Sequence, residues 1–250
     1  MALQVPEADL AQYKGLFPET PYNGKSYLPH DTPKACYAAM ISFMDRQVGR
    51  LMALLKELDL DDNTVVLFTS DNGTTHLKEQ VDAEFFDSVG PLRGLKGQLY
   101  EGGIRVPLVA RWPGVIRPGT EVTPMVQNLD CAETFLDIAG LPVPDRMQGL
   151  SMLPLMRGET PDDWRSSIYY HYYEGEGKVH NVYKHYGVRT ERYKLAFFYT
   201  LNEWEFYDLE KDPQEMRNEY ANPDYAAQVK ELKEELARLR EQYKVTEDDL

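Results

Sequence analysis

The chain has 250 residues, of which 42% are hydrophobic and 12% aromatic, and its formal net charge is −14. This composition is that of an ordinary globular protein, and the length suits one large domain or a domain with a smaller module. The acidic balance argues against nucleic acid and anionic membrane surfaces as partners, because both are bound through clustered Lys and Arg. An anionic substrate can still bind in a locally basic pocket.

The sequence contains no run of about 18 apolar residues, so we predict no membrane-spanning helix. Residues 1–6 lack the basic and apolar regions of a secretory signal peptide, and the localisation stays open. Cys36 and Cys131 do not form a C-x-x-C pair. This spacing favours buried free thiols over a zinc or redox site.

A helix is predicted to begin at Pro33, because Thr32 can cap it and proline fits the first turn. Residues 64–69 follow as an unbroken β-branched run, which is typical of a strand buried on both faces. Helix, turn and buried strand is the repeating unit of a mostly parallel α/β sheet. The predicted helix has one apolar face, with steps of three and four residues: Met40, Met44, Val48, Leu51, Leu55 and Leu58.

The connection over residues 74–103 is long and rich in glycine, and its apolar side chains predict an ordered, functional loop. A second strand is predicted over residues 106–112. A short helix is predicted over residues 130–139, ending at Gly140.

After about residue 164 tyrosine and phenylalanine become dense, and short strands in succession predict a small antiparallel sheet. A last helix, with one apolar stripe, is predicted to begin at Pro223. We therefore divide the chain into two parts, residues 1–165 and residues 166–250. The three predicted strands are residues 186–192, 193–199 and 205–209.

Asp71 and Asn72 come directly off the carboxyl end of the first strand, where open α/β sheets bind ligands. Both side chains offer oxygen ligands, which calcium and magnesium favour. Asp-Asn-Gly is also a common turn sequence, so a purely structural role is the alternative.

Lys96 lies between two glycines in the long connection, and its ammonium group is a compact donor for sulfate or phosphate oxygens. His76 and His185 are candidates for contact with an anionic or sugar substrate, or for proton transfer near neutral pH. A solvated lysine and packed histidines are the alternatives. The dinucleotide, Walker A, zinc-protease and nucleophile-elbow motifs are all missing from the sequence.

Four segments in chain order resemble the signatures of sulfatases, which belong to the alkaline-phosphatase superfamily. Residues 65–73 end in S-D-N-G, and residues 90–107 are similar to the "G-K…Y-E-G-G-x-R-x-P" signature. Residues 187–195 and 207–215 look like the C-terminal signatures of the family. The resemblance implies an α/β fold: part of an alkaline-phosphatase-like, mostly parallel sheet with flanking helices, then a small antiparallel sheet and a terminal helix.

The resemblance also implies roles for single residues. Asp71 and Asn72 would bind calcium, and Lys96 would hold a sulfate oxygen. His185 and His76 would lie near the substrate. The implied activity is hydrolysis of sulfate esters, on sugars, glycosaminoglycans or aryl sulfates, by a calcium-assisted formylglycine mechanism, in enzymes that are usually periplasmic, secreted or lysosomal.

The sequence departs from the family where the nucleophile is concerned. Formylglycine is made from a C/S-x-P-x-R motif, which this chain does not contain. Residues 3–6 resemble the stretch just after the family's H-x-P segment, so we expect the C-terminal part of a sulfatase. Such a part would bind calcium weakly and lack activity, and would associate with a complementary N-terminal half or with itself.

Two other interpretations stay open. The chain as it stands fits an inactive fragment or a binding module. A phosphatase or phosphodiesterase of the same superfamily would hold two zinc ions with Asp and His clusters, which fits Asp71, Asn72 and Lys96 less well than one calcium does. The exact sugar is also open, because residues up to about 120 resemble arylsulfatases and galactosamine-type sulfatases, whereas those from about 165 resemble glucosamine-6-sulfatases.

Overall fold

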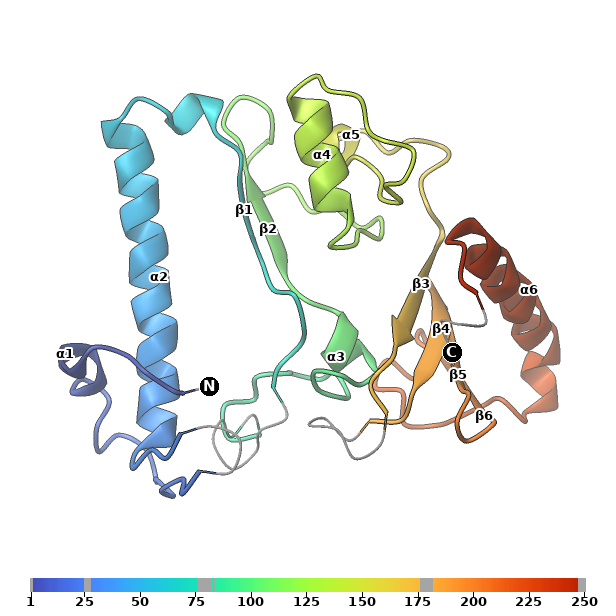
Figure 1. The fold of residues 1–250 in the computed structure, drawn as a ribbon, viewed down its shortest axis with the longest axis horizontal. Helices are drawn as coiled ribbons and strands as arrows, with labels where there is room; N and C mark the ends of the chain where they lie inside the picture. The colour runs from blue at the N-terminus through green and yellow to red at the C-terminus, as the bar shows by residue number, and fades with distance from the viewer. Residues whose placement is uncertain (1, 25–27, 76–81, 83, 176–181, 247–250) are drawn as a thin grey trace. The chain divides into compact units, whose positions relative to one another are not determined.

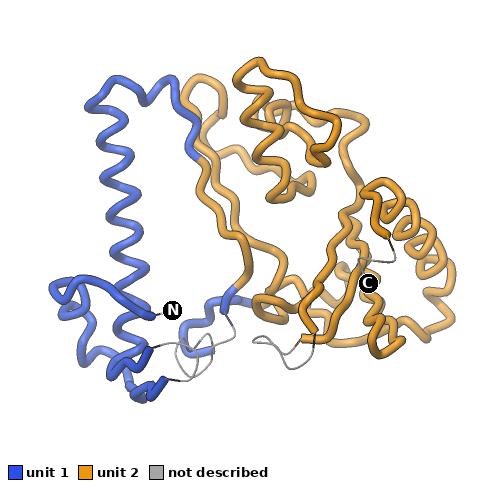
Figure 2. Tube along the Cα trace, in the orientation of Figure 1, with its two compact units in different colours: residues 1–66, 74–90 blue, residues 67–73, 91–250 orange. Residues whose placement is uncertain are grey.

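The structure is a computed structural model that describes residues 2–24, 28–75, 82, 84–175 and 182–246. The chain forms two compact units, shown in blue and orange in Figure 2. The first unit contains residues 1–66 and 74–90, and the second contains residues 67–73 and 91–250. The boundary that we predicted after residue 165 is not tested by this division into units, and it stays a prediction.

The first unit is built on one long helix, α2 (Pro33–Glu57), which begins where the sequence predicts. The predicted cap is wrong, because the Thr32 side chain makes no capping hydrogen bond and the N–H groups of Lys34 and Ala35 donate to Glu19. The short helix α1 (Glu7–Leu10) packs against its beginning, and the turn η1 (Asp61–Asn63) follows its end. Small side chains allow the close approach of α1, so the core of this unit is formed by Leu3, Leu10, Ala35 and Cys36.

Further along α2 the predicted apolar face exists, but much of it is exposed to solvent. Leu51 is 61% exposed and Leu58 is 55% exposed. Large apolar side chains at the surface of one helix face indicate a surface that another element can cover. Of the predicted members, Met44, Leu51 and Leu58 are exposed, and two apolar residues outside the predicted set, Ile41 and Leu54, are exposed as well.

In the second unit the strands β1 (Val66–Thr69) and β2 (Leu108–Arg111) form a two-stranded sheet. Both strands lie where the sequence predicts them. Our prediction that β1 is buried on both faces is wrong, because Phe68 is 41% exposed and Thr69 is exposed too. Among the described residues β1 has β2 as its sheet partner, so few elements cover its faces.

Three short helices lie between β1 and the C-terminal sheet of this unit. They are α3 (Glu101–Ile104), α4 (Asp130–Ile138) and α5 (Leu153–Met156). The helix α4 was predicted, whereas α3 and α5 were not, because a single helical turn carries too little periodicity to detect. Within the described part of the chain, no helix has the length and apolar character needed to cross a membrane.

The predicted antiparallel sheet has four strands in the order β3–β4–β5–β6. Helix α6 (Ala226–Gln242), which follows the short turn η2 (Pro223–Tyr225), lies along one face of this sheet (Figure 1). The strand β3 was not predicted. The strands are β3 (Ser167–Tyr172), β4 (His185–Thr190), β5 (Tyr193–Phe198) and β6 (Glu203–Asp208).

Both faces of this sheet are covered, as strand β5 shows. Its residue Leu195 belongs to the cluster formed with Val229 and Leu232 of α6. Ala196 and Phe198 point the other way, because side chains alternate along a strand, and they pack with Leu99. The loop that contains Leu99 therefore rests on the face of the sheet opposite to α6.

Candidate functional site

The segment that carries Asp71 and Asn72 is held against a pair of glycines. The Ser70 hydroxyl donates to the Asn72 carbonyl oxygen at 2.8 Å, which closes the turn after β1. The N–H of Gly73 donates to the carbonyl oxygen of Gly103 at 3.0 Å. A Cβ at Gly73 would lie 2.0 Å from the Gly102 oxygen, so this backbone contact requires glycine.

Residues 93–102, which we name the Lys96 loop, form a closed turn. The Gly102 N–H donates to the Arg93 oxygen at 2.7 Å, and the Gln98 N–H donates to the Leu95 oxygen at 2.9 Å. Gly97 has a φ of +86°, as the third residue of a type II turn requires. Lys96 therefore lies at the corner of the turn.

Gly103 joins these two segments. A Cβ at Gly103 would lie 2.6 Å from the Leu95 oxygen and 2.2 Å from the Gln98 oxygen. The same residue accepts the hydrogen bond from Gly73. The fold thus brings the backbone next to Asn72 and the backbone next to Lys96 to the same glycine, as the interpretation of these residues as one site requires.

The side chains of these candidates are available for a ligand. Asp71 is exposed, and Asn72 and Lys96 are partly buried. Their side chains make no hydrogen bond or ion pair with any residue that the structure describes; the Asp71 backbone oxygen accepts from Asn128 at 3.4 Å. Two oxygen-bearing side chains and one lysine side chain without a described partner are therefore carried by segments whose backbones meet at Gly103.

Four charged residues join the Lys96 loop to the C-terminal sheet, and we name them the buried ion cluster: Glu101, which belongs to the loop, with Arg189, Lys194 and Glu215. The Lys194 ammonium lies 2.6 Å from Glu215 Oε1 and 2.8 Å from Glu101 Oε1. Arg189 binds the other oxygen of Glu101 at 3.1 Å. Burial raises the pKa of Glu101, but Lys194 and Arg189 outweigh this and hold it below its ordinary value, so the carboxylate stays charged.

The sequence analysis found the segments of this cluster but not its members. Lys194 lies between the apolar residues Tyr193 and Leu195, so on a strand it points to the opposite face. A charged residue at an inward position of a strand was the signal that could have found it. The two carboxylates come from other segments, and only the fold brings them to Lys194.

Arg93 and Tyr100 fasten the loop further. The Arg93 guanidinium lies 3.7 Å from the centre of the Tyr100 ring and donates to the backbone oxygen of Glu215. The Tyr100 hydroxyl donates to Glu205 at 3.3 Å. Burial, together with the Glu205 charge, raises the pKa of Tyr100 to about 12, so the hydroxyl keeps its proton.

His185 is buried, with 2% of its surface exposed, and its ring stacks on Tyr172 at 5.4 Å. Its Nδ1 lies 2.8 Å from the Tyr183 oxygen, and burial lowers the pKa of the imidazole. The neutral ring donates from Nδ1 to that oxygen, which leaves Nε2 as an acceptor. His185 also contacts Phe198 at 5.2 Å, in the cluster with Leu99, and His76 lies outside the described residues.

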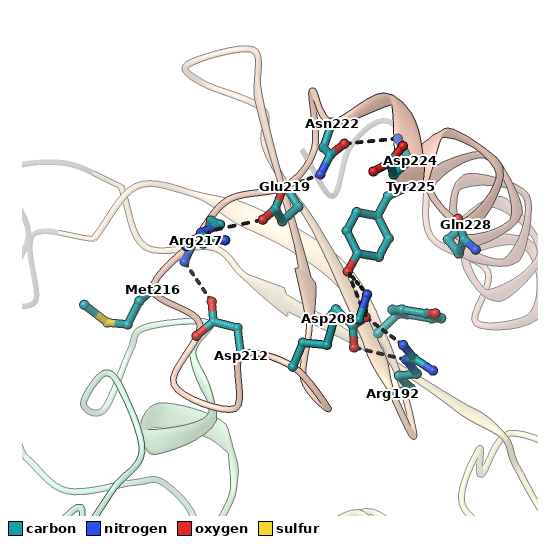
Figure 3. A pocket seen from close by; sticks show the side chains of 12 residues that line it. Arg192, Asp208, Asp212, Met216, Arg217, Glu219, Asn222, Asp224, Tyr225 and Gln228 are labelled. Atoms are coloured by element: carbon teal, nitrogen blue, oxygen red, sulfur yellow. Dashed lines mark hydrogen bonds and ion pairs between the residues drawn. The ribbon is translucent and has the colours of Figure 1, made fainter.

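A separate groove of about 570 Å³ lies between β6 and the start of α6 (Figure 3). Arg192 donates to both oxygens of Asp208, at 3.0 and 2.9 Å, and the Tyr225 hydroxyl donates to Asp208 at 3.0 Å. Lys211 and Arg217, which also line this groove, lie 3.9 Å from Asp208 and 3.7 Å from Glu219. Because every cation here has a carboxylate partner, the groove has no free charge for an anionic ligand.

Two family models match the chain. The model named "Sulfatase" matches residues 4–141, and the model "N-sulphoglucosamine sulphohydrolase, C-terminal" matches residues 95–242. The chain belongs to the sulfatase family. This confirms the resemblance that the four signatures indicated, and the sulfatase match includes Asp71, Asn72 and Lys96.

Characterised relatives agree with this assignment. The chain is 40% identical to an N-acetylglucosamine-6-O-sulfatase of Bacteroides thetaiotaomicron over 85% of its own length and 36% of the relative's. It is 30% identical to an arylsulfatase of Clostridium perfringens over 82% of its own length and 39% of the relative's. The chain thus spans less than two fifths of the length of these relatives.

Solved structures confirm the fold class. A structure described as a complex with its substrate D-glucosamine-2-N,6-O-disulfate has a TM-score of 0.75, 36% identity, and coverage of 86% of this chain and 42% of that one. A phosphonate monoester hydrolase of Agrobacterium radiobacter has a TM-score of 0.66 and 30% identity, with coverage of 84% and 41%. The predicted partial alkaline-phosphatase-like fold with a small antiparallel sheet and a terminal helix is therefore confirmed.

Proposed function

We propose that this chain supplies the sulfate-holding lysine and part of the calcium site of a sulfatase that hydrolyses sulfate esters of sugars. The observation that carries the proposal is that the backbone beside Asn72 and the backbone beside Lys96 both contact Gly103, and that the side chains of Asp71, Asn72 and Lys96 bind no described residue. A charged lysine left free at a turn corner is suited to an anionic ligand.

Asp71 and Asn72 fit calcium by the chemistry of their oxygens, because calcium takes six to eight oxygen ligands. Two side chains supply only part of such a shell. The described residues contain no group of three or more His, Cys, Asp or Glu side chains that could hold a metal ion. We therefore propose that this chain alone binds calcium weakly; the bound ion would supply positive charge beside the sulfate oxygens.

The residues of the chain then have separate tasks. Lys96 holds one sulfate oxygen and stabilises negative charge that grows on the sulfate during transfer. His76 is proposed to contact the sugar. His185 is proposed to contact it through Nε2, which carries no proton in the neutral ring. The formylglycine motif does not occur among the 250 residues, so these groups bind and orient the substrate but do not attack it.

A sulfated amino sugar is the substrate class that we favour, and an aryl sulfate is the alternative. The support is the N-acetylglucosamine-6-O-sulfatase relative and the disulfated glucosamine in the related complex. The phosphonate monoester hydrolase at 30% identity supports a second candidate, hydrolysis of phosphonate or phosphate monoesters. The same ammonium group would serve either anion.

The other candidate role is that of a binding module without activity. The exposed apolar face of α2, with Leu51 at 61% and Leu58 at 55%, supports association with a complementary chain or with a second copy. Ultracentrifugation of the purified chain tests self-association, and a monomer at high micromolar concentration would exclude a second copy as the partner.

Sulfate binding tests the main proposal. Inorganic sulfate, added at constant ionic strength, is expected to shift the NMR signals of the amides of residues 95–98, and Lys96→Met is expected to remove the shift. Lys230→Met is the matched control, because Lys230 is 79% exposed on α6. A sulfate response that survives Lys96→Met would contradict the proposal.

Calcium and turnover complete the test. Calorimetry is expected to give weak calcium binding that Asp71→Asn removes, whereas tight stoichiometric binding by this chain would contradict the partial site. No turnover of a chromogenic aryl sulfate is expected from the chain alone. Comparison of sulfate with phosphate in the NMR titration measures which of the two anions the chain prefers.

A further inference from the structure

We infer that Lys194 and its carboxylate partners form a positioning device that fixes the orientation of Lys96, so that the C-terminal sheet sets the geometry of the sulfate site. The inference rests on the proposed function in one respect, the role of Lys96. The contacts that form the device lie within the second unit, and they are the same whether or not Lys96 binds sulfate.

The first argument is that Lys194 is saturated by acceptors. Its ammonium group has three N–H donors, and it lies 2.6 Å from Glu215, 2.8 Å from Glu101 and 3.1 Å from the Leu99 oxygen. The side chain is fully buried. Every donor is thus used, and two of the three acceptors belong to the Lys96 loop.

The second argument is that Glu215 holds both ends of the loop. Its Oε2 accepts from the Glu101 N–H at 2.7 Å, and its backbone oxygen accepts from the Arg93 guanidinium. Its own φ is +55°, a conformation that a non-glycine residue adopts only when its surroundings require it. Because Arg93 and Gly102 close the loop, a shift of Glu215 would move both ends together.

The third argument concerns what a buried ion cluster contributes. Two carboxylates face two cations, so their formal charges cancel, although burial raises the pKa of Glu215 above its ordinary value. Burial of charges gives little net stability compared with apolar residues of the same volume. The contacts are directional, however, and they join a loop to a strand. Leu99, 2% exposed against Ala196 and Phe198, provides the apolar packing beside them. The ion pairs therefore fix the orientation of the Lys96 loop relative to strand β5.

Two substitutions test the inference in the full chain. Lys194→Met removes the ammonium group and keeps most of the length of the side chain, but leaves two buried carboxylates close together. The second variant, Lys194→Met with Glu215→Gln, keeps the cluster neutral, since Glu101 and Arg189 remain paired. Arg165→Met is the matched control: it breaks another buried ion pair, with Asp130, that does not contact the Lys96 loop.

Hydrogen exchange measured by mass spectrometry gives the first readout. In the double variant we expect the amides of residues 98–102 to exchange about tenfold faster, while the amides of β4 and β5 change less than about twofold. In Arg165→Met we expect the ratio between these two groups of amides to stay as in the unmodified chain. Exchange that rises equally in loop and sheet would mean a merely structural role and would overturn the inference.

Inorganic sulfate gives the second readout. The double variant is expected to bind sulfate about tenfold more weakly, although Lys96 itself is unchanged, and the Arg165→Met variant is expected to bind it normally. If the unmodified chain does not bind sulfate, the proposed function fails at Lys96, and the exchange comparison still decides whether the cluster orients the loop. Unchanged exchange in the loop overturns the positioning role in either case.

Discussion

The contact between Gly73 and the glycine pair can be broken by one methyl group. A Cβ at position 73 would lie 2.0 Å from the Gly102 oxygen, whereas real Cβ atoms do not approach within 3.0 Å, so the two segments must separate by about 1 Å. That shift also breaks the 3.0 Å hydrogen bond from Gly73 to Gly103. We therefore expect Gly73→Ala to cost about 2–4 kcal/mol of unfolding free energy.

The same separation moves Asp71 and Asn72 away from Lys96. For Gly73→Ala, urea denaturation measures the loss of stability. A sulfate titration monitored by NMR measures the change in sulfate binding. Gly49→Ala is the control, because nothing lies within 4 Å of a Cβ there and alanine favours the interior of α2 by about 0.5–1 kcal/mol. A Gly73→Ala chain with unchanged stability and unchanged sulfate binding would refute the contact.

The remaining predictions concern other parts of the molecule. Asp130→Asn should cost about 3–5 kcal/mol in urea denaturation, because it leaves the buried Arg165 guanidinium without its carboxylate; a loss below about 1 kcal/mol would argue against the pair. Hydrogen bonds from Arg192 lower the pKa of Asp208 from its ordinary value of 3.8 to about 2. The stability from this carboxylate is therefore complete above pH 4 and is lost as the pH falls towards 2, and Asp208→Asn should remove about 1 kcal/mol of that acid dependence in thermal denaturation. Leu51→Glu, at an exposed position, should change the melting temperature by no more than a few degrees but reduce self-association in ultracentrifugation. Unchanged self-association would exclude this helix face from the contact.

The sequence alone determined the elements with strong local patterns. The apolar spacing along α2, the β-branched run of β1 and the stripe of α6 each occur where they were predicted. The four signatures also identified the family correctly, and they contain Asp71, Asn72 and Lys96. Such features depend on neighbouring residues, so they can be found without knowledge of the fold.

Only the tertiary structure decided how these signatures act together. Lys194, Glu101 and Glu215 lie far apart in sequence, and their charges meet in a fully buried position that no local pattern predicts. The exposure of Phe68 likewise depends on which elements cover the sheet, and not on the apolar run that formed the strand. Burial and ion pairing are properties of neighbours in space, because desolvation and Coulomb energy depend on distances that the order of residues does not fix.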